Sequence, residues 1–302
     1  MRAELLDHLA LIVQEEATDS AAPKTKISVL RKVTEEQAAA IQAAVKDLYF
    51  FTSGEDLYNC YQANMVELLD SVMEFAQLHF SNRQKMSDLL DEMSFSFSRL
   101  LLNLLAMFRS FLDHGSAALT RRFGIDSPEF RAWQAAQSAE YDGYVSYRFF
   151  SNLRNYAQHV GMPPLHFSVD QSTEREGIRI GLDFYRDELL SNYSKWSRHA
   201  REDLINGADK VFLLPLLDEW SHCFHRLVRS IQSIRSDAVM ASVEKILSVR
   251  TEFKVGLGGS IAMMPEPKIS EAGQLNLGIR YLPEHKAQEI AQGTFLNALK
   301  DY

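Results

Sequence analysis

The chain has few cysteines: its 302 residues include only Cys60 and Cys223, which lie far apart. Two isolated cysteines exclude a disulfide framework or a zinc module built from neighbouring cysteine pairs, and they fit a reducing cytoplasm. An excess of basic residues is also lacking, because the formal net charge is -8. A protein that coats nucleic acid through a bulk positive field is therefore disfavoured, while a local basic cleft on an acidic body stays open.

Long apolar runs are lacking as well. The stretch LLLNLLAM, residues 100–107, is too short to span a bilayer, and residues 1–16 alternate acidic with apolar residues without a small-residue cleavage site. We therefore expect neither secretion nor membrane insertion, and a cytoplasmic location. With 46% hydrophobic and 24% charged residues, the composition is that of an ordinary globular chain, long enough for one large domain or two smaller ones.

Helical periodicity dominates the first 160 residues. We expect helices over residues 3–15, 34–48, 52–78, 84–114 and 127–159. Thr52 and Glu55 have capping-box spacing at the start of the third helix, Gly115 is expected to end the fourth, and Gly143 to bend the fifth. Three long helices joined by modest loops predict antiparallel neighbours in a bundle.

After residue 160 the period changes to two residues. LHFSV and GIRIGLDF predict a β-hairpin at about residues 165–184, with Ile178, Ile180, Leu182 and Phe184 on one side. Helices resume over residues 185–204 and 209–250, and the tail offers two short strands and a closing helix. The expected fold class is mainly α, and its three parts are N-terminal helices over residues 1–51 that pack on the bundle, an antiparallel helical bundle with the hairpin over 52–250, and a short α+β appendage over 251–302.

The helix over residues 127–159 carries an unusual polar stripe. Because a helix advances about 100° per residue, Asn155 shares its side with Tyr141, Tyr144, Arg148, Ser151, Asn152, Gln158 and His159. The predicted core face holds Val145, Phe149, Leu153, Tyr156 and Val160. Lys, Asp and Glu are absent between residues 144 and 161, although they dominate solvated faces. This composition favours an interface or binding site; a solvated face, or a buried polar network around Asn155 and His159, is the alternative.

Part of this stripe resembles a known family signature. RNYAQH, Arg154 to His159, is similar to the Arg-polar-x3-His motif of the HEPN superfamily (higher eukaryotes and prokaryotes nucleotide-binding), and Arg154, Asn155 and His159 match it residue by residue. The resemblance covers residues 52–234. It implies an HEPN-like bundle and a metal-independent endoribonuclease without a cofactor, acting on RNA as a homodimer. A toxin or phage-defence setting, with an antitoxin or defence-system partner, is implied by the same resemblance.

The residue types suit this chemistry. Cleaving RNA without a metal requires removal of the 2′-hydroxyl proton, stabilisation of charge in the transition state, and protonation of the departing 5′-oxygen. Histidine transfers protons near neutral pH, arginine can hold two phosphate oxygens, and an amide can orient either group. These roles are expected for His159, Arg154 and Asn155. Substrate-binding or supporting roles are expected for Arg148, Asn103, His114, Tyr144 and Gln158.

A second segment, RSFLDH, repeats the Arg-to-His spacing from Arg109 to His114. Ser110 replaces the amide there, and the i, i+4 placement of Arg109 and Asp113 predicts a structural ion pair. The rival to the nuclease is a non-catalytic RNA- or nucleotide-binding or scaffold protein that uses the same polar helix face. The acidic net charge and the lack of a basic run favour this rival.

Overall fold

The chain forms two compact units in a computed structural model that describes residues 7–15, 24–172, 177–236, 239–255, 258–266, 268–269, 275–276 and 278–293. Unit 1 combines the two ends of the chain, Met1–Thr52 and Arg235–Tyr302. Unit 2 is the continuous segment Ser53–Ile234. The N-terminal part and the tail, expected as separate additions to a bundle, thus belong to one unit.

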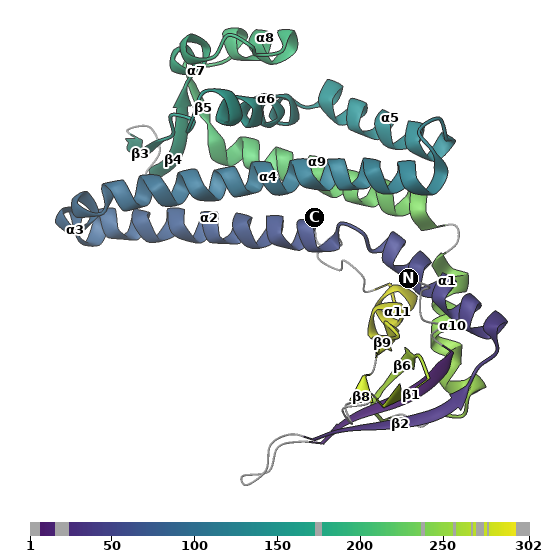
Figure 1. The fold of residues 1–302 in the computed structure, drawn as a ribbon. Coiled ribbons are helices and arrows are strands. Elements are labelled where there is room, and N and C mark those ends of the chain that lie inside the picture. Colours follow the sequence, from purple (N-terminus) through teal and green to yellow (C-terminus); the bar gives the residue numbers. More distant parts are fainter. Residues whose placement is uncertain are drawn as a thin grey trace. The chain divides into compact units, whose positions relative to one another are not determined.

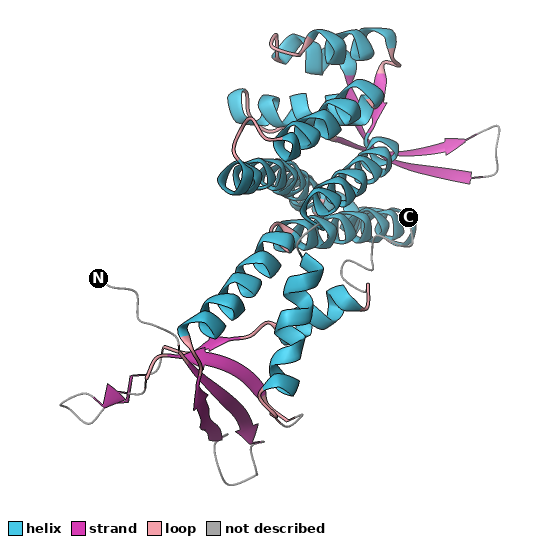
Figure 2. Cartoon of the chain, turned by 90° about the vertical axis from the view of Figure 1, so that its right-hand side faces the viewer, coloured by secondary structure: helices cyan, strands magenta, loops and turns pink. Residues whose placement is uncertain are grey.

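Unit 2 is a helical bundle with a small sheet, in which α2 and α4 lie side by side (Figure 1). Its helices are α2 (Glu55–Ser81), α3 (Arg83–Asp88), α4 (Leu90–Phe123), α5 (Pro128–Gly143), α6 (Val145–His159), α7 (Arg186–Asn192), α8 (Arg198–Asn206) and α9 (Leu213–Arg235), whose last residue belongs to unit 1. Its strands are β3 (His166–Ser172), β4 (Gly177–Tyr185) and β5 (Lys210–Phe212). The expected mainly helical fold with small antiparallel sheets is confirmed (Figure 2).

Aromatic side chains form the centre of unit 2. The Phe224 ring of α9 lies 4.6 Å from Tyr61 and 4.9 Å from both Phe108 and Phe111, measured between ring centroids. α4 is long and apolar enough, by length and composition, to cross a membrane, and Phe108 and Phe111 on this helix contact Phe224 in the core. Burial in the core therefore accounts for part of the apolar character of α4.

Gly115 lies inside α4, so the expectation that it ends this helix is wrong. The helix continues to Phe123 and ends at Gly124, whose φ of 92° is a left-handed value. A Cβ atom at Gly115 would lie 2.6 Å from Ile231 Cδ1 of α9 and 3.2 Å from Trp133 Cζ2 of α5. Glycine is therefore needed for close helix packing there.

The start of α2 also differs from its prediction. Thr52 caps the end of α1, while the N-cap of α2 is Gly54, with a φ of 96° and no side-chain capping bond. The predicted capping box of Thr52 and Glu55 is therefore wrong, because a left-handed turn between the two helices replaces it.

Unit 1 packs helices on a four-stranded antiparallel sheet with the order β2-β1-β6-β9. The elements are β1 (His8–Glu15), β2 (Lys24–Lys32), α1 (Glu35–Phe51), α10 (Val239–Glu252), β6 (Ser260–Met264), β7 (Lys268–Ile269), β8 (Leu275–Asn276), β9 (Arg280–Tyr281) and α11 (Glu284–Ala291). Leu9 and Met263, which pair across β1 and β6, join Ile41 of α1 and Val249 of α10 in one apolar core.

The expected helix near Ala3 to Glu15 is wrong over its described part, because His8–Glu15 is the inner strand β1. Residues 3–6 lie outside the described residues. A short apolar run fits a helix or a strand equally well, and its partners decide between them. Here one partner, β6, comes from the far end of the chain.

The predicted hairpin is confirmed: β3 and β4 pair antiparallel, with His166 opposite Asp183, and Leu182 and Phe184 are buried. β5 adds a third strand through Val211 and its neighbours. Leu182 and Phe184 of the predicted apolar face are therefore in the core, and Asp183 on the other face is buried as well. The side chains of Ile178 and Ile180 lie outside the described residues.

Candidate functional site

The polar stripe lies on α6, which is separate from α5. Tyr144 has extended φ and ψ angles of -129° and 127°, and it is both the C-cap of α5 and the N-cap of α6. The break confirms the bend expected at Gly143. Beyond it, the carboxylate of Glu219 on α9 accepts a 3.0 Å hydrogen bond from the Ser146 N–H in the first turn of α6. A carboxylate at this place satisfies a free N–H group and the helix dipole.

α6 is buried on more sides than its polar stripe predicts. Phe149 stacks on Trp196, with 6.0 Å between centroids, as expected of a core-face residue. Phe150, which belongs to neither the predicted core face nor the polar stripe, stacks on Trp220 with 4.3 Å between ring centroids. Val145 and Val160, predicted to face the core, are 44% and 46% exposed because they lie at the helix ends. The helix is therefore clamped from two sides.

A cavity of 410 Å³ lies between α4, α5 and α6. Its polar lining includes Arg109, Gln137, Tyr141, Ser151, Arg154 and Asn155. A neighbouring cavity of 330 Å³ shares Leu105, Arg109 and Arg154 with the first and extends it to Gln158. We call the two together the α4–α6 groove. Its size is that of a small-ligand pocket.

Two of the three motif residues line this groove. Arg154 donates a 3.4 Å hydrogen bond to the side-chain oxygen of Asn155 and has no carboxylate partner among the described residues. His159 is exposed in the last turn of α6 and lies outside the lining of both cavities. The structure therefore brings Arg154 and Asn155 together and leaves the imidazole in solvent.

Arg109 of α4 lines the same groove as Arg154 of α6, a placement that sequence reasoning missed. Its guanidinium pairs with Asp113 at 2.7 Å and 3.0 Å, as the i, i+4 spacing predicts. The packing of α4 against α6 adds a second guanidinium to the groove. No pattern in the sequence indicates this, because Arg109 and Arg154 are far apart along the chain. The carboxylates of Asp113 and Asp142 also line the groove, so its two guanidiniums are formally balanced by two carboxylates.

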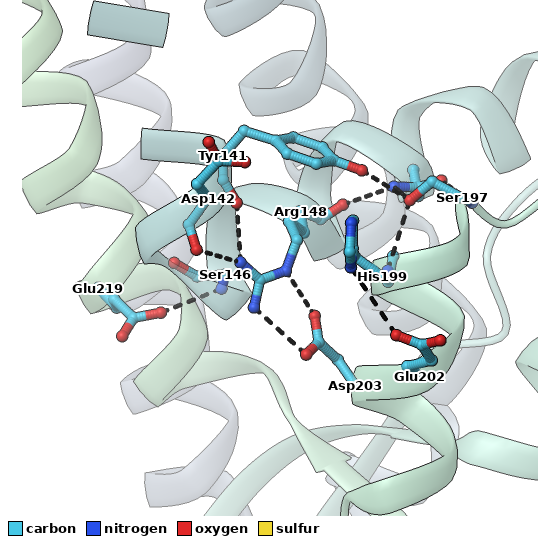
Figure 3. A network of polar contacts seen from close by, with 11 residues as sticks. Tyr141, Asp142, Ser146, Arg148, Ser197, His199, Glu202, Asp203 and Glu219 are labelled. Atoms are coloured by element: carbon cyan, nitrogen blue, oxygen red, sulfur yellow. Dashed lines mark hydrogen bonds and ion pairs between the residues drawn. The ribbon is translucent and has the colours of Figure 1, made fainter. Parts of the chain in front are cut away.

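Arg148 is held by protein groups (Figure 3). Its Nε and Nη2 donate to Asp203 at 2.6 Å and 3.2 Å, and its Nη1 donates to the carbonyls of Tyr141 and Asp142 at 2.8 Å and 2.9 Å. The hydrogen bonds to Asp203 raise the pKa of Arg148. Its side chain is 12% exposed, so the expected phosphate-binding residue sits in an internal ion pair.

Asn152, another residue of the stripe, is buried in the same network. Its amide donates to the Arg148 carbonyl at 2.8 Å and to Ser197 Oγ at 3.1 Å, and its oxygen accepts from the Ser197 N–H at 2.8 Å. Tyr141 Oη completes the set at 2.7 Å from Ser197 Oγ. The start of the stripe is therefore a buried polar network, whereas the predicted alternative placed such a network around Asn155 and His159.

The remaining predicted residues are spread around unit 2. Tyr144 lies under the Arg226 guanidinium at 4.1 Å, a cation–π contact. Asn103 donates to Asn64 of α2 at 3.0 Å, and His114 is exposed on α4. Gln158 alone among them lines the groove.

Metal-binding and comparative searches give no further assignment. No group of three His, Cys, Asp or Glu side chains is suitably placed for a metal within the part of the chain that the structure describes. Comparison with protein-family models, curated proteins and solved structures finds no match for this chain. The resemblance to the HEPN superfamily therefore stays a hypothesis that rests on Arg154, Asn155 and His159.

Proposed function

We propose that the chain is a metal-independent endoribonuclease of the HEPN type. The observation that supports this most directly is Arg154, which lines the α4–α6 groove beside Asn155 without a carboxylate partner among the described residues. A guanidinium in this state can hold two oxygens of a phosphate. An RNA phosphodiester is the ligand that fits both this guanidinium and the resemblance to the HEPN motif.

Each motif residue has a role in the proposed reaction. Arg154 stabilises the charge that develops on the phosphate oxygens, and Asn155 holds the phosphate or orients the imidazole. His159, exposed one turn further along α6, transfers a proton to or from the substrate. The attacking 2′-oxygen loses its proton and bonds to phosphorus, while the bond from phosphorus to the 5′-oxygen breaks. The 5′-oxygen takes up a proton, which leaves a 2′,3′-cyclic phosphate and a 5′-hydroxyl.

We further propose a homodimer, because one copy leaves His159 apart from the groove. Two copies whose α6 ends face each other supply two imidazoles for the two proton transfers. Val160 and Met162 flank His159 and are 46% and 49% exposed, so they offer apolar contact area beside it. An antitoxin or defence-system partner is proposed on the resemblance alone.

The alternative is a non-catalytic RNA- or nucleotide-binding or scaffold protein that uses the same face of α6. It is favoured by the position of His159 outside the groove, since binding needs only Arg154 and Asn155. In this case the groove holds a phosphate and no bond is broken.

Cleavage by the purified protein separates the two. Mixed RNAs incubated in EDTA are expected to yield 2′,3′-cyclic phosphate ends. His159→Ala is expected to lower the rate by about 10² to 10⁴-fold with little change in RNA affinity. Arg154→Ala is expected to lose affinity and rate, and Arg154→Lys to restore little, because an ammonium lacks the planar fork.

The control is His199→Ala, an exposed imidazole on α8 outside the groove, which is expected to cleave like the wild type. Unchanged cleavage by His159→Ala, or a wild type that cleaves no RNA, contradicts the nuclease and favours the binding protein.

A further inference from the structure

Unit 1 has a groove of its own, far along the chain from the motif. It lies between α1 and the β9 edge of the sheet and has a volume of 450 Å³. Lys46 and Tyr49 of α1 and Arg280 and Tyr281 of β9 form its walls, and Val45 and Leu282 contribute apolar surface. We call it the α1–β9 groove.

The charged and aromatic groups of this groove are available to a ligand. Tyr49 is 54% exposed and Tyr281 is 51% exposed, so solvent and a ligand can reach both rings. Among the described residues, Lys46 and Arg280 have no carboxylate partner, and the groove lining contains no Asp or Glu. The groove is therefore cationic and aromatic.

We infer that the α1–β9 groove binds a segment of single-stranded RNA, and this inference rests on the proposed RNA substrate. Bases stack on exposed aromatic rings whatever their sequence, and cations beside the rings contact the backbone phosphates. Tyr49 and Tyr281 supply the rings, and Lys46 and Arg280 supply the cations.

The exposure of the rings favours a strand over a free nucleotide. Sites that bury about 70 to 90% of a small ligand are enclosed, whereas the two tyrosines that wall this groove are about half exposed to solvent. β9 has only two residues and forms the sheet edge, so the groove is bounded there by a short edge strand. A polymer that continues past the edge suits this shape.

The test measures binding of a labelled, unstructured RNA of about 15 nucleotides, matched to the site size of single-strand binding folds. The full-length chain carries His159→Ala, so that cleavage does not disturb the measurement. Tyr281→Leu is expected to raise the dissociation constant about fivefold or more, while Tyr281→Phe, which keeps the ring, retains the wild-type value.

Charge variants test the phosphate contact separately. Lys46→Gln is expected to lower the slope of log affinity against log salt by about 0.7, the value for one phosphate contact on a single strand. The matched control is Lys26→Gln on β2, an exposed lysine at the opposite edge of the sheet, which is expected to leave the slope unchanged. Tyr49→Leu tests the second ring in the same way as Tyr281→Leu. Thermal melts verify that each variant is folded.

Several outcomes overturn the inference. The inference is wrong if Tyr281→Leu, Tyr49→Leu and Lys46→Gln all bind RNA with wild-type affinity. It is also wrong if the groove binds AMP alone, or if polyglutamate competes for the groove as well as RNA does. Failure of the nuclease proposal gives a different result. If the wild type never cleaves RNA but binds it through the α1–β9 groove, the nuclease proposal is wrong and the groove inference is kept. If the wild type cleaves RNA but the groove variants bind it normally, the nuclease proposal is kept and the groove inference is wrong.

Discussion

Arg148 joins α5, α6 and α8 through its bonds to Asp203 and to two carbonyls at the end of α5. Arg148→Met is expected to lower the free energy of unfolding by about 3 kcal/mol, because it strands the Asp203 carboxylate, which is 26% exposed. Denaturant unfolding measures this loss.

Arg198→Met is the matched control, since this arginine pairs with Glu202 on α8 but is 84% exposed, and little change is expected. If Arg148→Met unfolds like the wild type but loses RNA affinity, Arg148 contacts the ligand instead.

His225 of α9 gives the fold a dependence on pH. Burial is the main cause that lowers its pKa to about 4, and His222 and Arg229 add positive charge. The unfolded imidazole takes up a proton near its usual pKa of about 6.5, before the folded one does. The free energy of unfolding is therefore expected to fall as the pH drops from about 6.5 to about 4, by about 3 kcal/mol at most.

Unfolding curves recorded at pH 7 and pH 4 measure this effect. His225→Gln is expected to reduce the difference between the two, while His199→Gln, an exposed histidine, keeps it. Equal pH dependence in the wild type and His225→Gln would show that His225 is not the source.

At the scale of the helices, α4 packs closely against its neighbours at Gly115, where a Cβ atom would meet Ile231 of α9 and Trp133 of α5. Gly115→Ala is expected to lower the free energy of unfolding by about 1 to 3 kcal/mol, because overpacking shifts these side chains. Thermal and denaturant melts measure the change.

Gly143→Ala at the end of α5 is the control, since beyond its own helix backbone and chain neighbours no atom of the described residues lies within 4 Å of the added Cβ. It is expected to be neutral or to stabilise by up to about 1 kcal/mol, because alanine favours helix. A Gly115→Ala variant that is more stable than the wild type contradicts the close packing.

Assembly of the whole molecule decides whether the proposed site is complete. We expect a homodimer in sedimentation velocity, and we expect Val160→Asp combined with Met162→Asp to give a folded monomer that no longer cleaves RNA. The physical reason is that both side chains are exposed apolar neighbours of His159.

Ile125→Asp is the control, an exposed apolar position between α4 and α5 that is expected to leave the assembly unchanged. A wild type that is monomeric at every concentration and fully active contradicts the facing-copy proposal.

Local patterns in the chain were sufficient for much of unit 2. The long helices follow from apolar spacing, the break near Gly143 from a glycine, and the β3–β4 hairpin from its two-residue period. The ion pair of Arg109 with Asp113 follows from one helical turn of spacing. In each case the interacting residues are neighbours along the chain, so the pattern already contains the contact.

Contacts between distant segments decided the rest. His8–Glu15 is a strand because β6, from the other end of the chain, pairs with it, and Gly115 continues a helix because α9 approaches there. Arg148 lies on the same helical face as Asn155, as predicted, yet its guanidinium is bound by Asp203 and not available to a ligand. Arg109 reaches the groove only because α4 packs on α6. A residue's helical face follows from its number, but its partner depends on where the chain returns, which only tertiary packing sets.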